Sequence, residues 1–534
     1  MENKEKIKEK FKEKGRGGIQ LLEKGHKGFI HVLFSRTGLI ALLFLLQVVL
    51  IFGIYRWFAA FIPQIVGLGV VFEIIMIIHL LNSESNNVSK ITWLVLIMLA
   101  PVMGTLLYWY TLMDIGHRAE KRRIDKLVNQ TRGMIPQNDQ IMERIEREKE
   151  SLLGLSHYLN RMGCFPVYDK TEVMYFPTGE DKFQEMLIRL EQAEKFIFLE
   201  YFIIDEGLMW GRVLEILARK AKQGVDVRLL YDGTCEFSTL PHDYPKRLQI
   251  LGIQCKMFAP LTPLVSTRYN YRDHRKILVI DGKVAFNGGI NLADEYINYI
   301  ERFGHWKDTA VMLRGEAVRS FTLMFLQMWN FDEKNMEFEQ YVNATIKPFE
   351  EEKGYVIPYG SSPLDKEKVG EMVYIEILYH AKKYVHIMTP YLILDGELEM
   401  ALKYAAERGV EVELILPGIP DKKAPYILAK THYESLMKAG VKIYEYLPGF
   451  VHAKVVVSDD ETAVVGTINL DYRSLYHHFE CATLMFKTKC IEKIEEDFIS
   501  TRKKCRLVTE EVLTKEKWKI LIFGYVIKVL APLL

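Results

Sequence analysis

The sequence predicts an α/β protein with two similar halves that form a pseudo-dimer within one chain, preceded by transmembrane helices. Three observations predict this fold class. Strand-like and helix-like segments alternate in the same order twice between residues 151 and 515. A polar five-residue pattern occurs once in each half with identical spacing. Long apolar runs come before both halves, within residues 37–112.

The first 36 residues form a basic N-terminal segment. They carry many lysines, which interleaved glutamates dilute. Two compatible interpretations are a solvated helix with frayed ends and a cytoplasmic segment close to anionic lipid. Over the whole chain, 70 Lys and Arg balance 69 Asp and Glu. The composition therefore provides no global basic field for nucleic acid.

Residues 37–112 form the predicted transmembrane region of two or three helices. Apolar runs cover residues 38–60, 63–81 and 91–110, and each is long enough to cross a hydrocarbon core of roughly 30 Å. Basic residues flank the region on both sides, and the positive-inside rule places both flanks in the cytoplasm. That requires an even number of crossings, in conflict with three runs. We favour an even count, a multi-pass protein of the cell membrane and a body that faces the cytoplasm.

The rest of the chain divides into four parts. Residues 113–150 are charged and helix-prone, which indicates a helical connector. Residues 151–345 form the first half and residues 346–515 the second, and a stretch rich in Pro, Gly and Ser links them. Residues 516–534 are apolar but short for a span. They are typical of a membrane-associated amphipathic helix, or of a segment packed in a groove of the body.

The two halves repeat one order of elements. In the first half, a strand-like run at 196–205 leads to a helix that ends near Gly224 and then to a second strand. In the second half, the run at 385–395 leads to a helix that ends near Gly409 and again to a strand. This alternation predicts a largely parallel sheet in each half. Two copies predict an α/β sandwich with its functional site on the pseudo-twofold interface.

Each half carries one copy of the polar pattern, with Lys at +2 from His, Asp at +7, Gly at +14 and Asn at +17. The two copies are His274, Lys276, Asp281, Gly288 and Asn291, and His452, Lys454, Asp459, Gly466 and Asn469. With each residue type at roughly 5% usage, matching four such positions after any of the fourteen histidines has a chance on the order of one in ten thousand. The duplication is therefore not a coincidence.

The pattern suits chemistry at an anionic phosphate. On a strand, residues i and i+2 share a face, so each Lys points the same way as its His. The ammonium and the Asn amide hold phosphate oxygens while the imidazole attacks or moves a proton. Two facing histidines supply a nucleophile, which forms a phosphohistidine, and a general acid for the leaving alcohol. The paired Lys and Asn supply the positive field, so we expect no metal and no other cofactor.

Both copies match the signature H-x-K-x4-D-x6-G-x-x-N, and through it the chain resembles the phospholipase D superfamily over roughly residues 151–515. Three further stretches, together with the membrane runs, are similar to bacterial cardiolipin synthases: 291–296, 303–308 and 469–474. The similarity implies transfer of a phosphatidyl group from one phosphatidylglycerol to another, with release of glycerol. The implied partners are phosphatidylglycerol and anionic membrane lipid, with no nucleic acid.

The resemblance also implies roles for individual residues. The expected catalytic residues are His274, Lys276, Asp281, His452, Lys454 and Asp459, and the expected phosphate-binding residues are Asn291 and Asn469. The family also has a carboxylate that orients each histidine, which we assign to Asp308 in the first half and Glu480 in the second. A more structural role is the alternative for the two motif aspartates. The expected nucleophile is His274, with His452 as general acid and base.

The sequence departs from the family pattern at three positions. His478 stands where the family has Asn, and Gly289 and Thr467 replace the Ser of a Gly-Ser pair. These departures affect donor details rather than the reaction class, and we expect His477 and His478 to support the site rather than to catalyse. Two rival functions stay open. One is a hydrolase or another phosphatidyltransferase of the same superfamily, and the other is a non-catalytic membrane scaffold that retains the fold.

Overall fold

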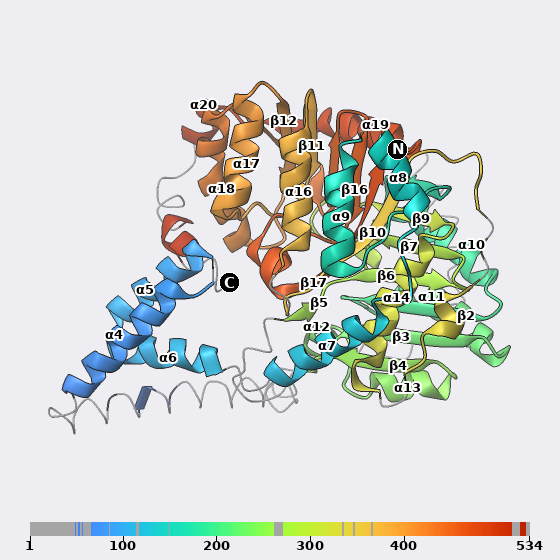
Figure 1. Cartoon of the computed structure of the whole chain (residues 1–534), viewed down its shortest axis with the longest axis horizontal. Helices are drawn as coiled ribbons and strands as arrows, with labels where there is room; N and C mark the ends of the chain where they lie inside the picture. Colours follow the sequence, from blue (N-terminus) through green and yellow to red (C-terminus); the bar gives the residue numbers. More distant parts are fainter. Residues whose placement is uncertain are drawn as a thin grey trace.

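The structure, a computed structural model, describes most of the chain. The described residues are 49, 52, 53, 56, 66–84, 86–113, 117–148, 150–260, 271–333, 336–344, 346, 348–364, 367–514 and 524–529. Within them the chain forms two large sheets with helices around them, and a group of helices at one end of the molecule (Figure 1). The predicted basic N-terminal segment, almost all of the first apolar run and most of residues 516–534 lie outside the described residues.

The first half is built on a seven-stranded sheet with the order β1-β9-β7-β6-β2-β3-β4. Its strands are β1 (Glu172–Phe176), β2 (Phe196–Tyr201), β3 (Asp226–Asp232), β4 (Gln254–Phe258), β6 (Lys276–Ile280), β7 (Val284–Gly288) and β9 (Ala310–Arg314). Its helices are α10 (Gly179–Glu191), α11 (Leu208–Lys222), α12 (Thr234–Ser238), α13 (Tyr244–Ile250), η3 (Asp294–Ile297), α14 (Val318–Trp329), η4 (Asn330–Asp332) and α15 (Glu339–Val342).

The second half repeats this sheet strand for strand, in the order β10-β17-β16-β15-β11-β12-β13, with β18 added at the far edge. Its strands are β10 (Tyr355–Ser361), β11 (Tyr384–Met388), β12 (Glu411–Pro417), β13 (Lys442–Tyr446), β15 (Val455–Ser458), β16 (Thr462–Gly466), β17 (His478–Phe486) and β18 (Cys505–Leu507). Its helices are α16 (Val369–His380), α17 (Gly396–Glu407), α18 (Lys423–Lys438), η5 (Arg473–His477), α19 (Cys490–Arg502) and α20 (Glu510–Thr514). The predicted duplication of an α/β fold is confirmed.

The prediction of a largely parallel sheet is wrong, because both sheets are mixed. Only the neighbours β2-β3-β4 and β11-β12-β13 are parallel within them. The strand after each histidine, β6 or β15, runs antiparallel to β2 or β11 and turns back tightly into the next strand. A tight hairpin connection allows only antiparallel pairing. The stretch predicted as a linker also contains β10, an edge strand that tolerates Pro358 because an edge position does not need every ladder hydrogen bond.

The halves are interlocked rather than merely adjacent. The first-half helix α14 packs against β10 of the second half, and the second-half helix α19 packs against β1 of the first half. Short strands also pair across the halves. β5 (Arg272–Asp273) runs parallel to the start of β17, and β14 (Gly449–Val451) runs parallel to β8 (His305–Lys307). The pseudo-twofold interface therefore consists of shared cores and shared backbone hydrogen bonds.

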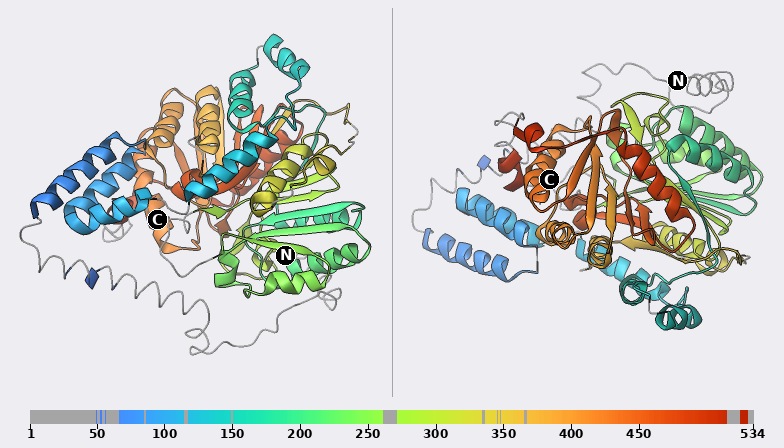
Figure 2. Two further views of the ribbon diagram at one scale, coloured as in Figure 1. Left: turned by 60° about the horizontal axis from the view of Figure 1, so that its bottom comes forward. Right: turned by 90° about the horizontal axis from the view of Figure 1, so that it is seen from above.

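Three helices precede the body and lie together beside the second half (Figure 2). They are α4 (Val66–Asn82), α5 (Asn87–Leu99) and α6 (Pro101–Met113). The third apolar run is thus two helices rather than one, because a proline disfavours helical backbone in the residue before it and suits the first turn of a new helix. Among the described residues, no helix combines the length and the apolarity needed to cross a membrane.

The predicted connector is helical in its described residues, with α7 (His117–Thr131) and α8 (Asp139–Arg147) followed by α9 (Leu152–Gly163). Buried side chains of α8 and α9 join the hydrophobic core of the second half, although the prediction placed 151 onward in the first half. At the other end, residues 524–529 are helical. There Ile527 packs near Leu428 of α18, and Thr92 of α5 donates a hydrogen bond to the Val529 carbonyl. These described residues therefore pack against the body.

Candidate active site

Both motif histidines lie at the seam between the halves. His274 follows β5, and its backbone N–H donates to the Phe479 carbonyl of the second half over 2.9 Å. His452 follows β14, and its N–H donates to the Lys307 carbonyl of the first half over 2.7 Å. Each histidine therefore takes its backbone position from a strand pair that contains both halves. The predicted location of the site at the pseudo-twofold interface agrees with this arrangement.

The orienting carboxylates are exchanged between the halves. His274 Nδ1 lies 2.9 and 3.0 Å from the two oxygens of Glu480, which belongs to the second half. His452 Nδ1 lies 2.7 Å from Asp308 Oδ2, which belongs to the first half. Both carboxylates are fully buried. The assignment of one carboxylate to the histidine of its own half is corrected, because the inter-half strand pairs bring each carboxylate beside the other half's histidine.

This exchange fixes the hydrogen-bonding state of both rings. A carboxylate accepts hydrogen bonds, so Nδ1 of each ring carries the proton. Burial lowers the pKa of His274 well below its usual value, and the charges of Lys276 and Lys454 lower it further. Burial and Lys454 together lower the pKa of His452 to about 4, against the opposing effect of Asp308. Both rings are therefore neutral near pH 7 in the ligand-free site, and Nε2 of each ring carries a free lone pair.

The two motif lysines lie beside the two motif histidines. Lys276 Nζ donates to the carbonyl of His274 over 2.6 Å, and Lys454 Nζ donates to the carbonyl of His452. Burial lowers the pKa of Lys276 to about 8 and that of Lys454 to about 7, although Glu480 and Asp308 respectively oppose the change. Two buried ammonium groups beside two imidazoles form a field that suits an anion and opposes a cation.

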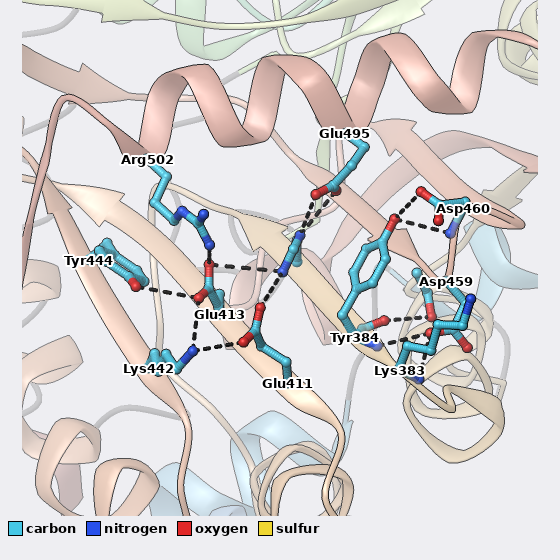
Figure 3. A network of polar contacts seen from close by, with 12 residues as sticks. Lys383, Tyr384, Glu411, Glu413, Lys442, Tyr444, Asp459, Asp460, Glu495 and Arg502 are labelled. Atoms are coloured by element: carbon cyan, nitrogen blue, oxygen red, sulfur yellow. Dashed lines mark hydrogen bonds and ion pairs between the residues drawn. The ribbon is translucent and has the colours of Figure 1, made fainter.

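The motif aspartates lie elsewhere. Asp281 accepts hydrogen bonds from the backbone N–H groups of residues 194, 195 and 196, at the start of β2. Asp459 accepts from those of residues 382, 383 and 384, at the start of β11 (Figure 3). Each follows a strand that separates it from its histidine by seven residues, or roughly 20 Å of extended chain. These hydrogen bonds favour the structural alternative for Asp281 and Asp459 over the expected catalytic role.

The two asparagines are buried near the histidines but already have protein partners. Asn291 Oδ1 accepts from the N–H of Ile203 over 3.0 Å, and its amide donates to the Tyr296 hydroxyl over 2.7 Å. The ring of Tyr296 packs against that of His452. The Asn469 side chain hydrogen-bonds to Asp471, and its oxygen has no hydrogen-bond partner among the described residues. Asn291 therefore braces the His452 side of the site.

The replacements at the Gly-Ser pair differ between the halves. A side chain at Gly289 would place its Cβ 2.2 Å from Asp308 Oδ1, so the carboxylate fills the space that glycine leaves. In the second half, the hydroxyl of Thr467 donates to Glu480 Oε2. The shorter carboxylate, Asp308, thus occupies the space beside a residue without a side chain. The longer one, Glu480, is held by a hydroxyl group.

A third histidine, His478, lies beside His274. His478 is buried, its ring centroid lies 5.4 Å from that of His274, and its Nδ1 lies 3.7 Å from Glu480 Oε1. Neither of its nitrogens has a hydrogen-bond partner among the described residues. Burial lowers its pKa to about 3, so the ring is neutral. Its position two residues before Glu480 on a strand was the available signal, since such residues share a face.

The fold and the site define a class of protein in which two similar α/β halves each contribute a His–Lys pair, and each half's carboxylate orients the histidine of the other. Similarity to known proteins identifies the family. The family described as "Cardiolipin synthase, PLD-like domain" matches residues 186–329 and 374–502, together about half of the chain. The family "Phospholipase_D-nuclease N-terminal" matches residues 71–110. The chain therefore belongs to the cardiolipin synthase family of phospholipase D-like proteins.

Individual relatives agree with the family. An uncharacterised protein of Streptococcus mutans serotype c is 58% identical over 86% of this chain and 99% of its own length. Cardiolipin synthases of Alkalihalophilus pseudofirmus and Geobacillus kaustophilus are 32% and 33% identical, over 83% and 86% of this chain and 88% and 92% of their own lengths. The crystal structure of phosphatidylserine synthase from Haemophilus influenzae shares the fold, with a TM-score of 0.53 and 15% identity over 70% of this chain and 99% of that one.

Proposed function

We propose that the protein is a cardiolipin synthase that transfers a phosphatidyl group from one phosphatidylglycerol to a second, giving cardiolipin and glycerol. The observation that carries the proposal is the pair of neutral, buried histidines, each oriented by the other half's carboxylate and accompanied by a lysine. Two such groups around one phosphodiester supply both a nucleophile and a proton donor. The curated relatives named as cardiolipin synthases support the choice of substrate.

In the first step, Nε2 of His274 attacks phosphorus while the bond from phosphorus to the glycerol oxygen breaks. His452 gives its Nε2 proton to that oxygen, and glycerol leaves. The ligand-free site lowers the pKa of His452 to about 4 mainly through burial and Lys454. A bound phosphodiester anion offsets the lysine charge, and Asp308 stabilises the imidazolium, so the ring is protonated when it is needed.

In the second step, the free hydroxyl of another phosphatidylglycerol loses its proton to His452 Nε2 and attacks phosphorus. The bond from phosphorus to His274 breaks, which restores the enzyme and releases cardiolipin. One phosphodiester replaces another, so the exchange is nearly thermoneutral and follows lipid concentration. Water competes with the acceptor hydroxyl, and burial of both histidines limits that competition.

Lys276 and Lys454 hold the non-bridging oxygens of the phosphodiester in both steps. Asn291 and Asn469 are proposed to add amide donors, Asn291 through the N–H that Tyr296 does not use. We assign Asp308 and Glu480 the role of orienting and stabilising the imidazoles across the halves. The scheme uses no metal and no cofactor.

We also propose that the protein is embedded in the cell membrane as a multi-pass protein, with its catalytic body on the cytoplasmic side. Helices α4, α5 and α6 expose many large apolar side chains, more than a water-facing surface usually carries. These are Val70, Val71, Ile74, Ile75, Ile78, Leu81, Ile91, Met98, Leu99, Leu106, Leu107 and Trp109. The proposed organisation is a membrane region at 37–112 and a connector at 113–150, followed by catalytic halves at 151–345 and 346–515.

The test is a product analysis. Purified full-length protein receives phosphatidylglycerol in liposomes, and mass spectrometry identifies the products. Cardiolipin and glycerol are expected. Phosphatidic acid as the main product would identify a hydrolase, and no turnover would identify a scaffold. His274→Ala and His452→Ala should each abolish turnover, whereas His380→Ala, at an exposed histidine of α16, should not.

A further inference from the structure

A second polar cluster, remote in sequence from the catalytic motifs, joins β11, β12 and α19 (Figure 3). We propose that it is a binding site for a divalent metal ion of the zinc type, with His386 Nε2, Glu411 and Glu413 as ligands. These three ligand groups lie within 4.8 Å of one another. The proposal is independent of the catalytic function.

The imidazole of His386 is fixed in direction. It stacks between Phe498 and Tyr384, with each ring centroid 4.4 Å away and interplanar angles of 8° and 28°. Its Nδ1 lies 2.9 and 3.0 Å from the two oxygens of Glu495. A carboxylate only accepts, so Nδ1 carries a proton, and Nε2 is the ring nitrogen left to bind a metal ion. Such a carboxylate–histidine pair is the usual support of a metal-binding imidazole.

The buried nitrogen Nε2 of His386 faces two carboxylates, and such surroundings favour a cation. His386 is 4% exposed, and Nε2 has no hydrogen-bond partner among the described residues. It faces Glu411 Oε1 at 3.5 Å and Glu413 Oε2 at 3.8 Å. An N–H···O hydrogen bond is about 2.7–3.2 Å long. Ligands of tetrahedral zinc, at about 2.0–2.2 Å from the metal, lie about 3.4 Å apart. The observed separations thus suit a shared metal ion better than a shared proton.

The carboxylates are held in place by two cations, and Arg502 binds the same Glu413 oxygen that faces His386 Nε2. Lys442 Nζ donates to Glu411 Oε2 over 2.8 Å and to Glu413 Oε1 over 3.3 Å, and Arg502 donates to Glu413 Oε2 over 2.6 Å. When a metal ion occupies Nε2 the imidazole itself is neutral, and the three glutamates of the cluster then exceed these two cations by one negative charge. Glu411 is 44% exposed, which leaves an open side for metal entry and for a water as fourth ligand. An imidazole nitrogen among the ligands favours zinc over calcium or magnesium.

The metal would fasten α19 to the sheet. The same helix carries Asp497, whose carboxylate accepts from Lys307 Nζ over 2.7 Å. Lys307 directly precedes Asp308, the carboxylate that orients His452. We therefore expect bound metal to stabilise the fold of the second half and its contact with the first.

The test uses the full chain in detergent after treatment with a chelator, with Zn²⁺ as the probe. Calorimetric titration, elemental analysis and thermal unfolding should show one bound equivalent and a higher unfolding midpoint. His386→Phe keeps an aromatic ring in the stack but removes both nitrogens, and Glu411→Gln changes only an exposed ligand. Both should lose the bound equivalent and the rise in midpoint. Glu495→Gln should weaken binding about 10–100-fold. His380→Gln, an exposed histidine 3.3 Å from Glu376, is the matched control and should bind as the wild type does.

A separate measurement distinguishes zinc at the proposed site from zinc at the catalytic cluster of His274, His478 and Glu480. Metal there would block turnover of phosphatidylglycerol and would persist in Glu411→Gln. Wild-type protein that takes up no Zn²⁺ would overturn the proposal. So would Glu411→Gln and His386→Phe proteins that both retain the equivalent and the midpoint shift.

Discussion

The two halves of the site have the same parts but support them differently. The first half presents a short carboxylate, Asp308, in the space beside Gly289, with the Thr309 N–H donating to it over 2.8 Å. The second half presents a longer one, Glu480, held by the hydroxyl of Thr467. Each carboxylate serves the histidine of the other half. The difference teaches that a duplicated active site can keep its spacing while each copy evolves its own way to fix one side chain.

The largest expected effect tests the exchange of carboxylates. Glu480→Gln should behave like His274→Ala, and Asp308→Asn like His452→Ala, with losses of about 10²–10⁴-fold in kcat. A phosphatidyl ester of p-nitrophenol separates the pairs because its leaving group needs no proton. The first turnover of p-nitrophenol release should recover in Asp308→Asn and His452→Ala but not in Glu480→Gln, because His452 is needed again only for transfer to the acceptor. The opposite pattern of recovery would mean that the nucleophile is His452.

The next effect concerns the different supports of the carboxylates. Gly289→Ala adds a Cβ that must displace Asp308, and a displaced catalytic group costs about 10²-fold in kcat. Thr467→Val removes one hydrogen bond to Glu480 without a change in shape, so we expect a loss of about tenfold. Steady-state kinetics with phosphatidylglycerol measure both. Equal losses would mean that the two carboxylates are supported alike.

A smaller effect distinguishes the two lysines by pH. Burial lowers the pKa of Lys454 to about 7 and that of Lys276 to about 8. The protonated amines are proposed to hold the anionic substrate, so kcat/KM should fall as pH rises through these values, by about tenfold per unit for each lysine that loses its proton. The second-half lysine is neutralised first. A flat profile between about pH 6 and about pH 9 would contradict the depressed values.

The smallest expected effect on catalysis belongs to the motif aspartates. Asp281→Asn and Asp459→Asn should leave turnover of the folded protein nearly unchanged, because both carboxylates hold backbone N–H groups. Asn tolerates their positive φ of 54° and 56°. Unfolding in denaturant should show a loss of about 1–3 kcal/mol for the buried Asp281 and less for the partly exposed Asp459. A folded variant without activity would restore a catalytic role for these residues.

The sequence was sufficient for the duplication and for the His–Lys pairs, because both depend only on spacing along the chain. It could not pair Asp308 or Glu480 with the right histidine, since that depends on which half each strand joins. The catalytic role expected for the motif aspartates also depended on regular spacing, and spacing does not reveal which end of a strand faces the site. His386 was unremarkable in sequence, because its glutamates come from another strand and from a distant helix.

Strand pairing across the seam has a consequence for biosynthesis. His274 receives its backbone partner, Phe479, and its carboxylate, Glu480, from residues made some two hundred positions later. A nascent chain that has completed only its first half holds His274, the proposed nucleophile, without the carboxylate that orients it. It should therefore stay inert toward the phospholipid around it until the last strands of the second half have been synthesised.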